Sequence, residues 1–167
     1  MAKSRALFIG GTGTISMAIV RELSKREDWE VWLLNRGNRS DEVPSNVRQI
    51  ACDISNEDDA RKKLSDMSFD VVNEFIGFVP EQVERDYRLF KGKTKQYIFI
   101  SSASAYAKPA ASYVITEGTT LSNPHWEYSR NKIACEEFLM KKYREENPET
   151  EKEPDAKPDT GESEGAS

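Results

Sequence analysis

Histidine and cysteine are scarce in this chain, and their scarcity limits the chemistry that it can carry. His125 is the only histidine, and Cys52 and Cys135 are the only cysteines among 167 residues. Neither cysteine has a neighbour at a spacing typical of metal ligands, so we predict no metal site. Two cysteines also make no disulfide framework, and we expect buried or neutral free thiols in a reducing cytoplasm.

Long apolar runs are also missing. No stretch approaches the roughly 20 residues that a membrane-spanning helix needs. The N-terminus leads through a few polar residues straight into an apolar segment at Arg5, which leaves no room for a signal peptide. We therefore expect a cytoplasmic protein that does not bind a membrane.

A concentrated positive charge is the third missing feature. Residues 147–167 hold seven of the 29 acidic and two of the 24 basic residues, so residues 1–146 are neutral with 22 of each sign. A neutral surface attracts a phosphate backbone weakly, and we expect no nucleic-acid partner. The acidic segment has three prolines and no aromatic residue. We predict one domain at 1–146 and a disordered acidic tail at 147–167.

What the chain does contain is an alternation of short apolar segments with helical patterns. Five strands are predicted, at Arg5–Ile9, Glu30–Leu34, Val47–Cys52, Phe69–Asn73 and Gln96–Ile100. Helices are predicted between most of them and after the last, the final one at about Trp126–Arg144. This alternation predicts an α/β class with a doubly wound parallel sheet, in the order 3-2-1-4-5.

A glycine cluster joins the first strand to the first helix, at Gly10, Gly11, Thr12, Gly13, Thr14 and Ile15. A tight turn excludes a side chain at Gly10, and a pyrophosphate lying against the backbone excludes one at Gly13. The helix N-terminus then offers N–H groups to the phosphates. Ser16 stands where the usual pattern has its last glycine. The alternative is an ordinary glycine-rich loop.

The ends of the second and third strands are candidates for binding the adenosine half of a dinucleotide. Asn35 and Arg36 follow the second strand, where an acidic residue would select NAD and a basic one pairs with the 2′-phosphate of NADP. We therefore favour NADP, and Arg39 lies nearby in the sequence as a second basic residue. The alternative is that Arg36 stacks on adenine or is simply a solvated loop residue. Asp53, beside Ile54, is a candidate acceptor for the adenine amino group or a local turn former.

Two further motifs carry groups suited to proton transfer. Tyr128 and Lys132 are four residues apart on a predicted helix and share one face. An ammonium beside a phenol lowers its pKa from about 10, which lets the phenol exchange a proton near neutral pH. The run from Ser101 to Tyr106 follows the last strand and places hydroxyls where ligands bind in such a sheet.

Together these motifs resemble the extended short-chain dehydrogenase/reductase superfamily, close to its NAD-dependent epimerase/dehydratase group. The resemblance covers about residues 5–146 and implies an NAD(P)-binding Rossmann fold. It implies that Tyr128 is the acid/base, that Lys132 tunes it and binds the nicotinamide ribose, and that Ser102 is the active hydroxyl. It places Ser101 and Gly77 beside the cofactor, although Glu74 and Phe75 stand where the family has small residues.

The resemblance implies an enzyme that transfers hydride at a hydroxyl- or keto-bearing carbon of a small molecule such as a nucleotide sugar. The family continues past the Tyr-Lys helix with a sixth strand and a substrate-binding region, whereas here the acidic segment follows. The alternative is therefore a dinucleotide-binding module without turnover. Without a sixth strand, residues 96–100 form an unpaired edge, and we expect a homo-oligomer.

Overall fold

The sheet is parallel throughout and has five strands. A computed structural model describes residues 2–37 and 43–148. In this part of the chain the strands lie in the order β3-β2-β1-β4-β5. Their bounds are Ser4–Ile9 (β1), Trp29–Asn35 (β2), Arg48–Ala51 (β3), Phe69–Glu74 (β4) and Thr94–Phe99 (β5). The predicted fold class and strand order are both confirmed.

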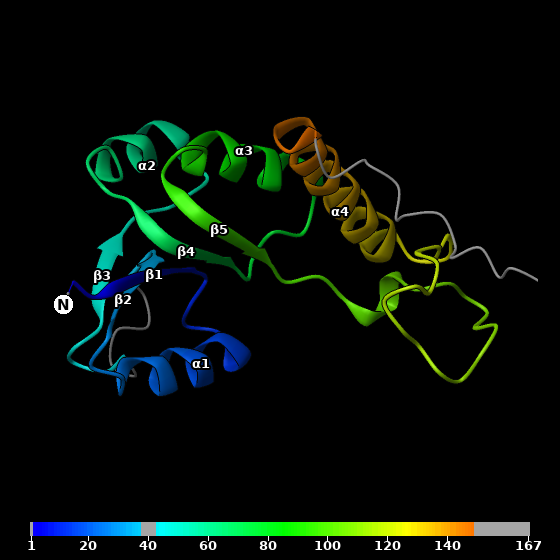
Figure 1. The fold of residues 1–167 in the computed structure, drawn as a ribbon, viewed down its shortest axis with the longest axis horizontal. Helices are drawn as coiled ribbons and strands as arrows, with labels where there is room; N and C mark the ends of the chain where they lie inside the picture. The colour runs from blue at the N-terminus through cyan, green and yellow to red at the C-terminus, as the bar shows by residue number, and fades with distance from the viewer. Residues whose placement is uncertain (1, 38–42, 149–167) are drawn as a thin grey trace, which may run out of the picture.

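Helices cover the sheet unequally. α1 (Thr14–Ser24) lies on one face, whereas α2 (Glu57–Lys63), α3 (Pro80–Phe90) and α4 (Glu127–Glu146) lie on the other (Figure 1). Between β5 and α4 a long connection, with a short 3-10 helix at Ala103–Ala105, extends beyond the carboxyl end of the sheet. α4 packs against α3, where the rings of Tyr87 and Phe138 meet edge to face with centroids 5.9 Å apart.

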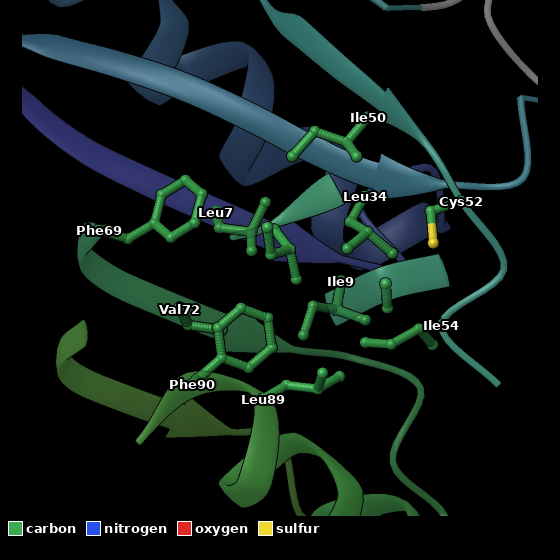
Figure 2. Close-up of a cluster of buried hydrophobic side chains, with 12 residues drawn as sticks. Leu7, Ile9, Leu34, Ile50, Cys52, Ile54, Phe69, Val72, Leu89 and Phe90 are labelled. Carbon is green, nitrogen blue, oxygen red and sulfur yellow. The ribbon is translucent and has the colours of Figure 1, made fainter. Parts of the chain in front are cut away.

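Each face of the sheet has its own buried cluster. Figure 2 shows the larger one, in which buried side chains from β1, β2, β3 and β4 meet Leu89 and Phe90 of α3, and Tyr97 of β5 packs against the cluster. On the opposite face, Met17 and Val20 of α1 pack on Phe8 and its neighbours. Because both faces of β1 are covered, this strand is apolar at every position from Ala6 to Ile9, all of them at most 1 % exposed.

The two thiols have the environment expected from the sequence. Cys52 and Cys135 are both buried and free. Burial raises the pKa of each thiol to about 11. Both are therefore neutral at physiological pH.

Several predictions fall at the limits of the described residues. α4 ends at Glu146, where the predicted domain ends. Arg39 and residues 149–167 lie outside the described residues, so the tail stays a prediction. Within the described ranges, no helix is both long and apolar enough to cross a membrane. In the same ranges, no three His, Cys, Asp or Glu side chains are grouped to hold a metal ion.

Candidate functional site: a cavity at the carboxyl ends of the strands

A cavity of about 560 Å³ opens where β1, β2, β3 and β4 end. Parallel strands that diverge toward helices on opposite faces leave a crevice at this edge of a sheet. Seven residues predicted from the sequence line it: Gly10, Thr12, Gly13, Asn35, Arg36, Asp53 and Ile54. Seven others were not predicted: Leu34, Cys52, Ser55, Ile76, Phe78, Gln82 and Arg85.

Gly10 is the residue on which the turn after β1 depends. Its φ is +76°, in the left-handed region that glycine adopts without strain. A Cβ added here would lie 2.4 Å from Cγ2 of Ile76, which follows β4. The turn therefore requires glycine both for its backbone conformation and for the close approach of a neighbouring strand end.

Ser16 gives the turn an anchor in place of the last glycine of the usual pattern. It is 1 % exposed. Its Oγ donates to the carbonyl of Gly10 at 2.9 Å and accepts from the N–H of Gly13 at 3.0 Å. The serine that replaces the usual glycine thus stabilises the loop through hydrogen bonds of its side chain.

Three members of the predicted glycine motif lie outside the cavity lining. Gly11 is buried, and a Cβ there would lie 2.4 Å from Cδ2 of Leu33, so this glycine serves packing against β2. Thr14 and Ile15 begin α1 with their side chains exposed, Ile15 by 69 %. A pattern of residue types does not distinguish a glycine needed for packing from one that faces a ligand.

The end of β2 presents a cation to the cavity. Asn35 uses its side chain locally: Oδ1 accepts from the N–H of Gly37 at 2.8 Å, and Nδ2 reaches Oε1 of Gln49 at 3.4 Å. This small turn leaves Arg36 exposed on the cavity wall. Within residues 2–37 and 43–148, no hydrogen bond or ion pair holds this guanidinium, and an exposed guanidinium on a cavity wall suits a phosphate.

Asp53 forms the turn after β3 and lies in the cavity wall. Its Oδ1 accepts from the N–H of Ser55 at 2.9 Å. Mainly because of this hydrogen bond, its pKa is lowered, and the charges of Arg36 and Arg85 add to the effect. The position of Asp53 is thus compatible with both predictions from the sequence, a local turn former and an acceptor for the adenine amino group.

The second wall comes from residues after β4 and on α3 that the sequence did not single out. Gln82 caps α3, because its Oε1 accepts from the N–H of Phe78 at 2.6 Å. Arg85, one turn later and only 8 % exposed, bonds Oδ1 of Asp86 through Nε at 2.9 Å and Nη2 at 2.7 Å. The sequence offered one signal for these two residues: Gln82 and Arg85 are three positions apart, so they share one side of α3.

Hydroxyl groups link the connection after β5 to the start of α4. Oγ of Ser102 and Oγ of Ser104 are 2.9 Å apart, and the buried Ser129 donates to Oγ of Ser104 at 2.9 Å. Asn123 donates to the carbonyl of Ser104 at 2.8 Å. This chain of bonds brings the predicted Ser102 close to the helical turn that carries Tyr128.

Tyr128 lies between aromatic neighbours and is half-buried. Its ring centroid is 4.9 Å from that of Trp126 and 6.4 Å from that of Phe78. Phe78 also lines the cavity. One face of the Phe78 side chain thus contributes to the cavity lining, and its ring also packs beside Tyr128.

Lys132 is buried, which the sequence did not predict. It is 2 % exposed, and its Nζ donates to the carbonyls of Gly77 and Ile100, each at 2.7 Å. The ammonium lies 5.8 Å from the ring centroid of Tyr128. Burial is the main cause of a lowered pKa for Lys132.

Two residues expected at the cofactor face other partners here. Gly77 does not line the cavity: it is buried, and its carbonyl binds Lys132. The hydroxyl of Ser101 donates to the carboxylate of Glu136 on α4. Both contacts join the strand ends to α4, which explains how Tyr128 and Lys132 are held at this edge of the sheet.

Comparison with known proteins agrees with this arrangement. The sequence profile of the NAD-dependent epimerase/dehydratase family matches residues 6–150. The chain belongs to this family. No individually curated protein matches the sequence.

Solved structures of epimerases and dehydratases share the fold. The UDP-Glc/GlcNAc 4-epimerase of Campylobacter jejuni is 20 % identical with a TM-score of 0.74, over 87 % of this chain and 50 % of that one. The dTDP-glucose 4,6-dehydratase of Bacillus anthracis, in complex with NAD, is 18 % identical with a TM-score of 0.72, over 86 % and 52 %. This member of the epimerase/dehydratase family thus spans about half the length of the solved structures that it matches.

Proposed function

We propose that this chain forms the dinucleotide-binding half of an epimerase/dehydratase and carries its acid/base group. Its substrate would be a small molecule with a hydroxyl- or keto-bearing carbon, with a nucleotide sugar as the favoured class. The supporting observation is the position of Phe78, which lines the cavity and also packs beside Tyr128. A dinucleotide in the cavity would therefore have its reactive end near the phenol.

The residues in the cavity fit a dinucleotide. Gly10 and Gly13 line the cavity, so a pyrophosphate bound there would lie against glycine backbone, and the N-terminus of α1 would offer its N–H groups. Arg36 and Asp53 would bind the adenosine half. When bound, the nicotinamide ring supplies a reversible acceptor of hydride.

Proton transfer falls to the residues beyond Phe78. The phenol of Tyr128 would exchange a proton with the substrate hydroxyl, and the hydroxyl of Ser102 would hold the substrate oxygen. The ammonium of Lys132 lies 5.8 Å from the centroid of the Tyr128 ring, on the side of the cavity wall formed by Phe78. Its bonds to two carbonyls fix the ammonium in place.

We propose NADP as the preferred cofactor, because the exposed Arg36 on the cavity wall would pair with a 2′-phosphate. Titration with NADPH and with NADH, followed by nucleotide fluorescence and thermal unfolding, tests both binding and preference. Arg36→Asp should weaken NADPH binding by roughly 10- to 100-fold, the value of a charge-assisted hydrogen bond, and NADH binding much less. Arg144→Asp, the same charge change at the exposed end of α4, should alter neither. Equal losses for the two nucleotides would contradict the preference.

A second candidate function is a dinucleotide-binding module without turnover. The observation that favours it is the coverage: the chain matches about half of each solved enzyme. Oxidation or reduction of the cofactor with a panel of nucleotide sugars distinguishes the two. Saturable binding with no turnover on any member of the panel would support the module.

Self-association through β5 is the expected oligomeric arrangement. β5 is the last strand in the described sheet, and Ile98 on it is 36 % exposed. An unpaired edge of this kind pairs readily with another chain. Sedimentation velocity at micromolar concentration should show a dimer or larger species, which Ile98→Lys reduces and the loop variant Val114→Lys does not. A clean monomer for the unmodified chain would contradict this expectation.

A further inference from the structure

Glu74 is an acidic residue in a place where the strand pattern calls for an apolar one. It is the last residue of β4 and is 0 % exposed. Its side chain lies on the same face as Val72, which belongs to the core under α2 and α3. A buried carboxyl without a full set of partners is costly, so its presence needs a physical reason.

One oxygen of Glu74 holds the segment that follows β4. Oε1 accepts from the N–H of Ile76, and Ile76 lines the cavity. The carbonyl of the next residue, Gly77, binds Lys132 at 2.7 Å, and a Cβ added at Gly77 would lie 3.1 Å from Cγ of Glu74. The carboxyl is thus packed against the segment that forms one wall of the cavity.

The other oxygen faces a second buried acid. Among the residues that the structure describes, Oε2 of Glu74 has no hydrogen-bond partner. Asp86 on α3, 0 % exposed, lies close enough to raise the pKa of Glu74, although burial is the larger cause, and together they raise it to about 9. Two carboxylates have no hydrogen between them, whereas a protonated Glu74 donates one to Asp86.

Asp86 in turn holds Arg85, which belongs to the same wall of the cavity. Its Oδ1 accepts both bonds of Arg85, which lines the cavity, and its Oδ2 accepts from the hydroxyl of Tyr97 at 3.0 Å. The charged groups around Glu74 are therefore Asp86 and Arg85 from α3 and Lys132 from α4, with the phenol of Tyr97 from β5. Ile76, in the segment after β4, bonds Glu74, and Arg85, on α3, bonds the neighbouring Asp86.

We propose that Glu74 is a positioning residue of the dinucleotide cavity, which holds Ile76 and Arg85 of the second wall in place through a proton shared with Asp86. The inference rests on the proposed function and goes beyond it by assigning a role to a residue that touches no ligand. Loss of the proton would place two like charges together away from water, and separation of α3 from the segment after β4 is the way to relieve it.

The test is the pH dependence of dinucleotide affinity in the full chain and in Glu74→Gln. The amide accepts from the N–H of Ile76 and donates to Asp86, as the protonated acid does. Unlike the acid, it does not become charged when the pH rises. The dissociation constant of NADPH for the unmodified chain should rise above pH 9 by roughly tenfold per pH unit, the limit for one required proton. The Glu74→Gln chain should match it at pH 7 and lack this rise.

Thermal unfolding gives a readout that needs no nucleotide. The pKa of Glu74 is raised from 4.5, its ordinary value in the unfolded chain, to about 9 in the folded chain. The bound proton therefore stabilises the folded state fully below pH 4.5, and this stabilisation is lost as the pH rises through about 9. The melting temperature of the unmodified chain should therefore fall relative to that of Glu74→Gln between pH 5 and pH 9. Glu74→Leu, which offers neither bond, should weaken NADPH binding at every pH.

The possible outcomes separate the inference from the function on which it rests. Failure of the unmodified chain to bind either nucleotide at any pH overturns the proposed function and this inference with it. Binding with the same pH profile in the unmodified chain and in Glu74→Gln overturns the inference alone. If Glu74→Leu does not fold, the comparison with Glu74→Gln still decides.

Discussion

Gly10→Ala is expected to destabilise the chain by more than about 2 kcal/mol and to weaken dinucleotide binding at least tenfold. The left-handed backbone at φ +76° costs an alanine about 1 kcal/mol. The new methyl would also overlap Cγ2 of Ile76 at 2.4 Å, and overpacking of this kind costs about 1–3 kcal/mol. Because the β-branched Ile76 is stiff and lines the cavity, its displacement changes the binding site.

Gly92→Ala is the matched control for this substitution. Gly92 has φ +74° in the turn before β5, and a Cβ there would meet nothing within 4 Å. It should show the backbone cost alone, a fall in melting temperature of roughly 2–4 °C, with no change in binding. Adding Ile76→Ala to Gly10→Ala should recover the part of the loss that comes from overlap. Equal destabilisation by Gly10→Ala and Gly92→Ala would show that Ile76 does not constrain the turn.

Tyr128→Phe is expected to lower turnover by at least 100-fold while the affinity for NADPH stays within about twofold. The substitution removes only the hydroxyl that would move the proton, and general acid/base groups contribute roughly 10²- to 10⁴-fold. The ring that packs beside Phe78 and Trp126 is kept, so the aromatic wall is preserved. Turnover is measured as cofactor oxidation or reduction with nucleotide sugars.

Tyr113→Phe serves as the control for loss of a phenol. Tyr113 is 98 % exposed on the long connection after β5, so its substitution should leave turnover and binding unchanged. A Tyr128→Phe chain that keeps full turnover would assign the proton transfer to another group. Binding without turnover in the unmodified chain would instead favour the module over the enzyme.

The sequence was sufficient to predict the secondary structure, the parallel sheet and its strand order. These depend on local properties: apolar segments of strand length, the glycine turn at Gly10 and the helical spacing of apolar residues all act over a few positions. Arg36 and Asp53 were found for the same reason, because residues directly after parallel strands gather at one edge of the sheet. The family match over residues 6–150 confirms the resemblance drawn from these motifs.

Only the tertiary structure decided which side chains face the cavity and which are used for packing. Gly11 packs on Leu33, and the hydroxyl of Ser101 turns to α4, although residue type alone made both candidates for the cofactor site. Arg85 reaches the cavity because α3 packs over β4, a contact that no local pattern encodes. The pairing of Glu74 with Asp86 has the same origin: burial and proximity across elements, which arise only when the helices pack, make an ordinary carboxyl hold a proton.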